Sequence, residues 1–147
     1  MDKKVITFEE INFLARTIAS RIEDEGITHV VGLARGGLVP ATIISYKLDL
    51  PLLACGVSSY EGTKKTENFR LHQPLNLAQF QAVNAHVLVV DDICDTGDTM
   101  KWITQKLALA DIKYQTACIL TKEKHTKWLK HYGSVVPDDK WIVFPWE

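Results

Sequence analysis

Four carboxylates follow directly on a short apolar run in the middle of the chain. Residues 87–90 precede Asp91 and Asp92, and Asp95 and Asp98 come shortly after them. A short β-prone run that ends in turn-forming residues is typical of a buried parallel strand. Acids with no basic residue between them repel one another strongly unless a cation or a hydroxyl-rich ligand lies among them. This stretch is therefore the first candidate for chemistry.

Thr96, Gly97 and Thr99 are interleaved with these acids, and the amphipathic residues 100–110 predict a helix directly after them. Because the predicted strand is followed directly by the predicted helix, the acids lie at the carboxyl end of the strand, where α/β sheets bind ligands. Glycine and hydroxyl residues before a helix suit a phosphate, because free backbone N–H groups point at it. A phosphate site beside paired carboxylates fits a sugar phosphate. The alternative is a solvated acidic turn.

A second loop of the anion-binding kind precedes the acidic one. Arg35, Gly36 and Gly37 follow a strand predicted at residues 29–33 and come just before a short predicted helix, residues 40–48. Paired glycines let the backbone approach an anion closely, and arginine supplies charge-assisted hydrogen bonds. A plain turn is the alternative, but the position of this loop at the end of an earlier strand of the same predicted sheet favours binding.

The order acid-acid-x-x-acid-Thr-Gly-x-Thr in residues 91–99 closely resembles the motif with which type I phosphoribosyltransferases bind 5-phosphoribosyl-1-pyrophosphate (PRPP). The resemblance implies that Asp91 and Asp92 hold the ribose hydroxyls and, with Mg²⁺, the pyrophosphate. Asp95 would take the ring proton of the incoming base.

Residues 96–99 would then hold the 5-phosphate of PRPP through Thr96, Gly97, Asp98 and Thr99. Asp98 departs from the family pattern, because many relatives have Gly or Lys there. We expect its side chain to face away from the phosphate, since an acid beside it would weaken PRPP binding.

The loop of Arg35, Gly36 and Gly37 resembles the family's first loop, which holds the pyrophosphate of PRPP. In that family the peptide bond entering the arginine is often cis, a point that the sequence leaves open here. Ser59 and Tyr60 begin a long polar stretch, and they resemble the start of the mobile loop with which relatives cover PRPP. The resemblance adds both residues to the PRPP site.

The carboxyl-terminal tail contains three closely spaced aromatic residues, Trp141, Phe144 and Trp146. They belong either to a terminal strand that packs on the core or to a surface that stacks on a base. The pattern Trp-Ile-x-x-Pro-Trp-acid closely resembles the ending of bacterial and archaeal xanthine-guanine phosphoribosyltransferases. The resemblance makes Trp141 the residue that stacks on a purine, with Ile142 beside it. Lys122 matches the lysine that donates to the 6-oxygen of the purine, unless it is a surface lysine.

The resemblance implies a purine salvage enzyme that transfers phosphoribosyl from PRPP to a 6-oxopurine. Guanine, xanthine and hypoxanthine are not ranked by the sequence, and the products would be a nucleoside monophosphate and pyrophosphate. Two alternatives stay open: transfer to adenine or a pyrimidine, and a regulator that senses PRPP without catalysis. Lys122 and Trp141 argue against the first, and Asp95 argues against the second.

The wider pattern predicts one α/β domain over residues 1–147, with a parallel sheet flanked by helices. The resemblance adds a small base-binding hood from the carboxyl-terminal tail. Thr7 and Glu10 form a capping box for a helix that ends near Gly26. Further strands are expected at residues 51–57, 87–90 and 114–120, and residues 69–85 are expected to form a connector with strand or turn pieces.

Composition excludes several classes of function. The chain has 147 residues, with 17 basic and 18 acidic side chains and a net charge of −1, so nothing favours bulk nucleic-acid or membrane binding. The three cysteines, Cys55, Cys94 and Cys118, are irregularly spaced and fit buried reduced thiols. We expect a soluble, cytosolic protein and, from the resemblance alone, a homodimer or homotetramer.

Overall fold

The computed structural model describes residues 2–59 and 69–147, and its centre is a six-stranded sheet in the order β4-β3-β2-β5-β6-β7. The parallel strands are β2 (His29–Ala34), β3 (Leu52–Ser59), β5 (His86–Cys94), β6 (Lys113–Lys122) and β7 (His131–Val136). Strand β4 (Phe69–Gln73) pairs antiparallel with β3 at one edge. The predicted α/β class is confirmed, with one antiparallel edge strand added.

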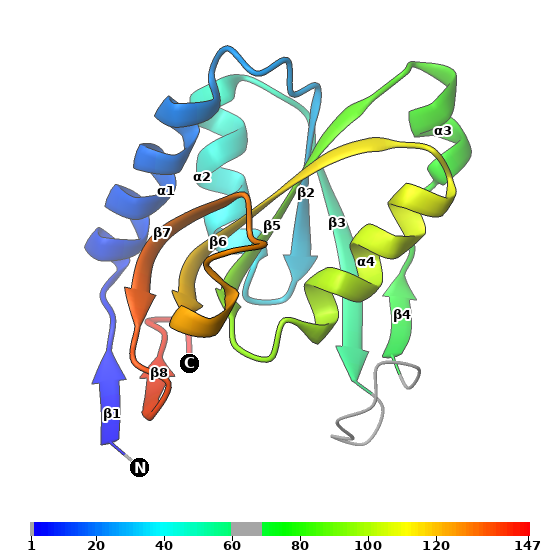
Figure 1. The fold of residues 1–147 in the computed structure, drawn as a ribbon. Helices are drawn as coiled ribbons and strands as arrows, with labels where there is room; N and C mark the ends of the chain where they lie inside the picture. Colours follow the sequence, from blue (N-terminus) through cyan, green and yellow to red (C-terminus); the bar gives the residue numbers. More distant parts are fainter. Residues whose placement is uncertain (1, 60–68) are drawn as a thin grey trace.

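Helices cover both faces of this sheet (Figure 1). Helices α1 (Phe8–Ile22) and α2 (Leu38–Leu48) lie on one face, and α3 (Leu77–Ala82) and α4 (Asp98–Leu109) lie on the other. Strand β5 serves both layers, because side chains alternate along a strand. Leu88 and Val90 pack with the α1–α2 layer, whereas Val87 and Val89 pack with the α3–α4 layer.

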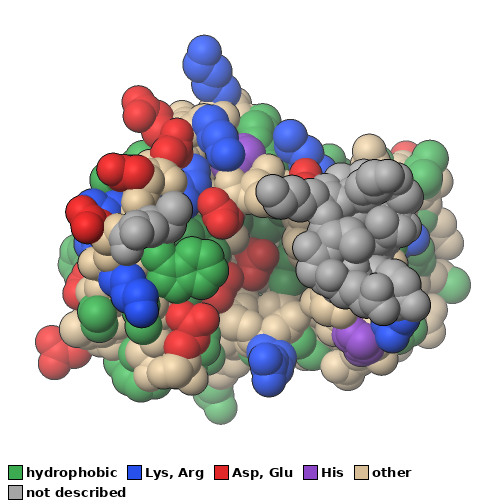
Figure 2. Space-filling view, turned by 90° about the horizontal axis from the view of Figure 1, so that it is seen from below, with side chains coloured by type: hydrophobic (Ala, Val, Ile, Leu, Met, Phe, Trp, Pro, Cys, Tyr) green, Lys and Arg blue, Asp and Glu red, His purple; other side chains and the backbone are tan. Residues whose placement is uncertain are grey.

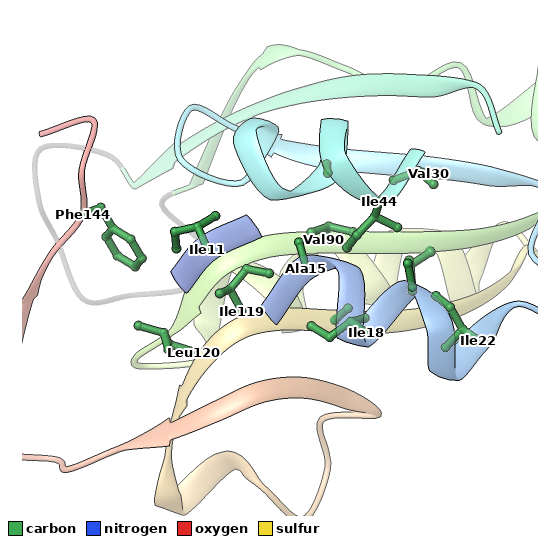
Figure 3. Close-up of a cluster of buried hydrophobic side chains, with 14 of the residues drawn as sticks. Ile11, Ala15, Ile18, Ile22, Val30, Ile44, Val90, Ile119, Leu120 and Phe144 are labelled. Atoms are coloured by element: carbon green, nitrogen blue, oxygen red, sulfur yellow. The ribbon is translucent and has the colours of Figure 1, made fainter. Parts of the chain in front are cut away.

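Helix α1 follows the predicted pattern. The Thr7 hydroxyl caps its start by accepting from the Glu10 backbone N–H at 3.1 Å. Its buried side, Ile11, Ala15, Ile18 and Ile22, faces the sheet and α2 (Figure 3). The helix ends at Ile22, before the predicted Gly26, whose positive φ of 77° places it in the turn toward β2.

One predicted boundary was wrong. Strand β5 does not end at Val90 but continues through the acids, because β6 is long enough to pair with it as far as Cys94, opposite Thr121. Within residues 69–85 the expected strand piece is β4, whereas helix α3 was not predicted. Helix α3 is too short to show a clear period in the sequence, and it is held by the buried ring of Phe80.

The small hood has a different origin from the one predicted. Strand β8 (Lys140–Val143) of the tail pairs in parallel with β1 (Asp2–Val5), so both chain ends build it. All four residues of β1 are exposed, which explains why no hydrophobic pattern marked this strand. The hood lies near the carboxyl end of β6 (Figure 1).

The three cysteines are buried and free, as predicted. Among the helices of the described ranges, none combines the length and the hydropathy needed to cross a membrane.

Truncating Ile18 tests the α1 side of the core. Ile18 is 0% exposed, so Ile18→Ala should lower the free energy of unfolding by about 2–5 kcal/mol through lost burial and a residual cavity. Phe13 on the same helix is 67% exposed, so Phe13→Ala should change that free energy by less than about 0.5 kcal/mol. Denaturant unfolding measures both, and equal losses would contradict the assigned orientation of α1.

Candidate functional site

The arginine-glycine loop and the acidic strand end meet at one edge of the sheet. Strands β2 and β5 are parallel neighbours, so their carboxyl ends open on the same side. A Cβ atom on Gly37 would lie 2.7 Å from the Val90 backbone oxygen and 3.0 Å from the Asp91 Cα atom. A Cβ atom on Gly36 would collide with the Asp92 carboxylate. Glycine is therefore required at position 37, where the neighbouring atoms belong to the backbone, and the peptide bond entering Arg35 is cis.

Asp91 and Asp92 lie half-buried in the last part of β5. The Asp91 Oδ1 atom accepts from the Asp92 backbone N–H at 2.9 Å, and the Asp92 Oδ1 atom accepts from the Ile93 N–H at 2.7 Å. Burial raises the pKa of Asp91, and the neighbouring charge of Asp92 raises this pKa further. Burial also raises the pKa of Asp92. Two crowded carboxylates with raised pKa values favour a cation beside them.

Oxygen donors of this kind suit Mg²⁺, which binds proteins through one or two carboxylates and completes its shell with water and substrate phosphate. Within the described part of the chain, no group of three or more His, Cys, Asp or Glu side chains is arranged to hold a metal ion. The pair Asp91 and Asp92 therefore fits an ion shared with a substrate better than a closed metal site.

The predicted phosphate loop follows at once. Gly97 has a positive φ of 83° and precedes α4, and the Thr96 hydroxyl accepts from the Asp98 N–H at 3.2 Å. A cavity of about 100 Å³ opens here. It is lined by Asp91, Ile93, Cys94, Asp95, Thr96, Gly97, Thr99 and Met100.

Asp98 does not line this cavity, which supports the expectation that its side chain faces away from a phosphate. Its position in the first turn of α4 gives the acid another role, because a negative charge there is stabilised by the helix dipole.

A larger cavity, of about 530 Å³, joins the arginine loop to the chain end. Figure 2 looks onto this side of the molecule, which is hollowed and carries acidic side chains near its centre. The lining residues are Arg35, Gly36, Val39, Asp92, Trp146 and Glu147.

Trp146 and Glu147 line this cavity, and neither of them was assigned to the site from the sequence. The Trp146 ring stacks on Phe144 with centroids 4.8 Å apart and planes 8° apart. The Glu147 Oε1 atom accepts from the Phe144 backbone N–H at 2.8 Å, which folds the chain end back. The terminal Pro-Trp-acid pattern could have pointed to these two residues, but it was used only to assign base stacking to Trp141.

Two of the predicted base-binding residues, Trp141 and Ile142, differ sharply in exposure. Trp141 is 55% exposed and lines neither of these two cavities, whereas Ile142, one position on, is 6% exposed and belongs to the core. This alternation is the period of β8.

Lys122, at the end of β6, is buried at 3% exposure. Its Nζ atom donates to the backbone oxygens of Pro137, Asp138 and Lys140 at 3.0, 3.4 and 2.6 Å. All three donors of the ammonium group are thus used on the turn before β8 and on the first residue of β8. Of the predicted covering loop, Ser59 ends β3 opposite Phe69, and Tyr60 lies outside the described residues.

Replacing Asp91 tests the crowded carboxylates. A carboxyl with a raised pKa binds its proton more tightly in the folded chain, so its ionisation lowers stability as pH rises above about 4, the value for an unfolded chain. Asp91→Asn should therefore raise the free energy of unfolding at pH 7, and the gain should vanish as pH falls toward 4. Denaturant titrations across this range measure it.

The matched control is Asp24→Asn, which changes an exposed acid and should alter stability by less than about 0.5 kcal/mol at every pH. A gain from Asp91→Asn that persisted unchanged at low pH would contradict the electrostatic explanation.

Comparison with known proteins agrees with this geometry. Residues 6–147 match the family model of the phosphoribosyl transferase domain. The chain is 31% identical to a xanthine-guanine phosphoribosyltransferase of Idiomarina loihiensis over 144 residues, covering 97% of this chain and 85% of that protein. A crystal structure of a purine phosphoribosyltransferase from Pyrococcus horikoshii superposes with a TM-score of 0.83 at 28% identity, covering 100% of this chain and 95% of that one. A Helicobacter pylori xanthine-guanine-hypoxanthine phosphoribosyltransferase shares the fold, with a TM-score of 0.81 at 20% identity over 99% and 94% of the two chains. This chain belongs to the phosphoribosyltransferase family.

Proposed function

We propose that the protein transfers the phosphoribosyl group of PRPP to a 6-oxopurine in purine salvage, giving a nucleoside monophosphate and pyrophosphate. The observation that carries this proposal is the contact of Gly36 with the Asp92 carboxylate, beside the phosphate-type loop. A loop for pyrophosphate, acids for ribose hydroxyls and amides for the 5-phosphate then share one edge of the sheet. The names of the relatives support a purine as acceptor.

PRPP would bind across both loops. The backbone N–H groups of residues 96–99 and the hydroxyls of Thr96 and Thr99 would hold the 5-phosphate, because they precede and begin α4. Arg35 is exposed at the cavity, and with the amides of Gly36 and Gly37 it would stabilise the departing pyrophosphate. Ser59 and Tyr60 would belong to the covering loop.

Asp91 and Asp92 would hold the ribose hydroxyls and Mg²⁺. When bound, Mg²⁺ would supply positive charge to the pyrophosphate oxygens. The two acids themselves would be kept ionised by that charge, which offsets the burial that raises their pKa values.

The purine would lie toward the hood. Trp141 is exposed enough to stack on a base, with Ile142 fixing its strand. The 6-oxygen of the purine would replace a carbonyl acceptor of Lys122, most easily that of Asp138, whose 3.4 Å bond is the longest of the three. An ammonium group is a donor only and cannot accept a hydrogen bond from the amino group of adenine, so this contact favours 6-oxopurines. Asp95, which is exposed on the loop, would take the ring proton of the base.

We further propose that residues 1–147 act as one domain, in the cytoplasm, as a homodimer or homotetramer. Light scattering of the purified protein tests the assembly.

A four-base panel tests the activity. The protein is incubated with PRPP, Mg²⁺ and guanine, xanthine, hypoxanthine or adenine, and pyrophosphate release is followed. We expect turnover with at least one 6-oxopurine, little with adenine, and loss of turnover when Mg²⁺ is chelated. No turnover with any 6-oxopurine would refute the proposal, and calorimetric PRPP binding without turnover would point to a sensor.

Asp95→Asn tests the proton acceptor. The amide keeps the size of the side chain but cannot take the ring proton, so kcat should fall by about 10²–10⁴-fold. The KM for PRPP should change little, because the loop amides are retained. An undiminished kcat would contradict the role given to Asp95.

A further inference from the structure

A buried histidine lies beneath the phosphate loop and has no part in the chemistry proposed above. His125 belongs to the 3₁₀ turn η3 (Glu123–His125) and is 6% exposed. Its Nε2 atom lies 2.6 Å from the backbone oxygen of Asp95. Its Nδ1 atom accepts from the indole Nε1–H of Trp128 at 3.0 Å.

These two bonds decide which nitrogen of the neutral ring carries the proton. An indole N–H is a donor only, so the Nδ1 atom must be the acceptor. The proton is then on Nε2, which donates to the Asp95 carbonyl. Trp128 thereby orients His125 toward the loop, as outer partners orient the histidines of functional sites.

The same two rings form the support on which the loop rests. A Cβ atom on Gly97 would lie 2.9 Å from the Trp128 Cζ2 atom and 3.0 Å from the His125 Cε1 atom. The rings meet edge to face, with centroids 5.5 Å apart and planes at 80°. The Lys101 Nζ atom of α4 lies 4.9 Å from the centre of the Trp128 ring, which ties the helix after the loop to the same support.

Residues 95–97 are therefore fixed at both ends: by a hydrogen bond at Asp95 and by ring contacts at Gly97. Loop atoms that must meet a phosphate and a ring proton gain from such support, because displacements of about 1 Å at a reacting group cost about 10²-fold in rate.

We propose that His125 is a positioning residue for the 5-phosphate loop and for Asp95, with Trp128 fixing its tautomer. This inference rests on the proposed function, because it assigns PRPP to that loop.

Two substitutions test the two hydrogen bonds of His125 separately. In His125→Gln the amide nitrogen can occupy the place of Nε2 and donate to Asp95. In His125→Asn the amide oxygen can occupy the place of Nδ1 and accept from Trp128, but nothing reaches the Asp95 carbonyl. We expect His125→Asn to lower kcat/KM for PRPP by about 10–100-fold, and His125→Gln to retain it within about threefold.

The matched control is His131→Gln. His131 is also buried, at 9% exposure, and its Nε2 atom bonds to the Gln115 Oε1 atom at 2.7 Å at the opposite, amino-terminal end of β7. This variant should keep wild-type kcat and KM. Equal activity of His125→Asn and the wild type, or equal losses in His125→Asn and His125→Gln with matched thermal midpoints, would overturn the inference.

Nitrogen-15 NMR of the wild-type protein gives a readout independent of activity and of variant folding. We expect the Nδ1 resonance of His125 to be that of an unprotonated nitrogen and the Nε2 resonance to be that of a protonated one, with Trp128→Phe giving a mixture. A protonated Nδ1 in the wild type would overturn the inference. Absence of wild-type turnover would refute the proposed function, whereas turnover with an unaffected His125→Asn variant would refute only the role of His125.

Discussion

The close packing of Gly36 and Gly37 on the carboxyl end of β5 is the constraint on which the site depends. A side chain at Gly37 would meet the backbone oxygens of Leu33 and Val90, and a side chain at Gly36 would meet Asp92. Because β2 and β5 pair in parallel, their loops open at the same edge, and this packing places Arg35 and the half-buried Asp92 at one cavity. A pyrophosphate with its cation has complementary charge to that arrangement.

The apolar layers explain how the chain tolerates such a site. Strand β5 is buried on both faces, by Leu88 and Val90 on one side and by Val87 and Val89 on the other. The strand leads directly into Asp91 and Asp92, whose partial burial raises their pKa values. Burying two carboxylates lowers the stability of the fold locally, and consistent apolar packing elsewhere offsets that loss. Such a balance is expected in a folded enzyme.

A buried lysine joins the hood to the sheet through three hydrogen bonds. Lys122 ends β6 and holds the turn before β8 and the first residue of β8 through three backbone oxygens, and β8 is in turn paired with β1. A ligand that competes for the ammonium group would therefore act directly on the position of the hood. His125 plays the corresponding part under the phosphate loop, so each side of the site is supported by a buried basic side chain from the segment at the end of β6.

The sequence by itself determined the helices and strands with a clear apolar period, the order Asp91–Asp92–Asp95 with its phosphate loop, and the glycines of the arginine loop. These features depend on neighbours along the chain, and such local patterns are what periodicity and turn chemistry report. Only the tertiary structure decided the pairing of β1 with β8, the place of Trp146 in the arginine cavity, and the bond from His125 to Asp95. Each of these contacts joins residues that are far apart in the sequence. Strand order and core packing bring such residues together, and a local sequence pattern contains no information about either.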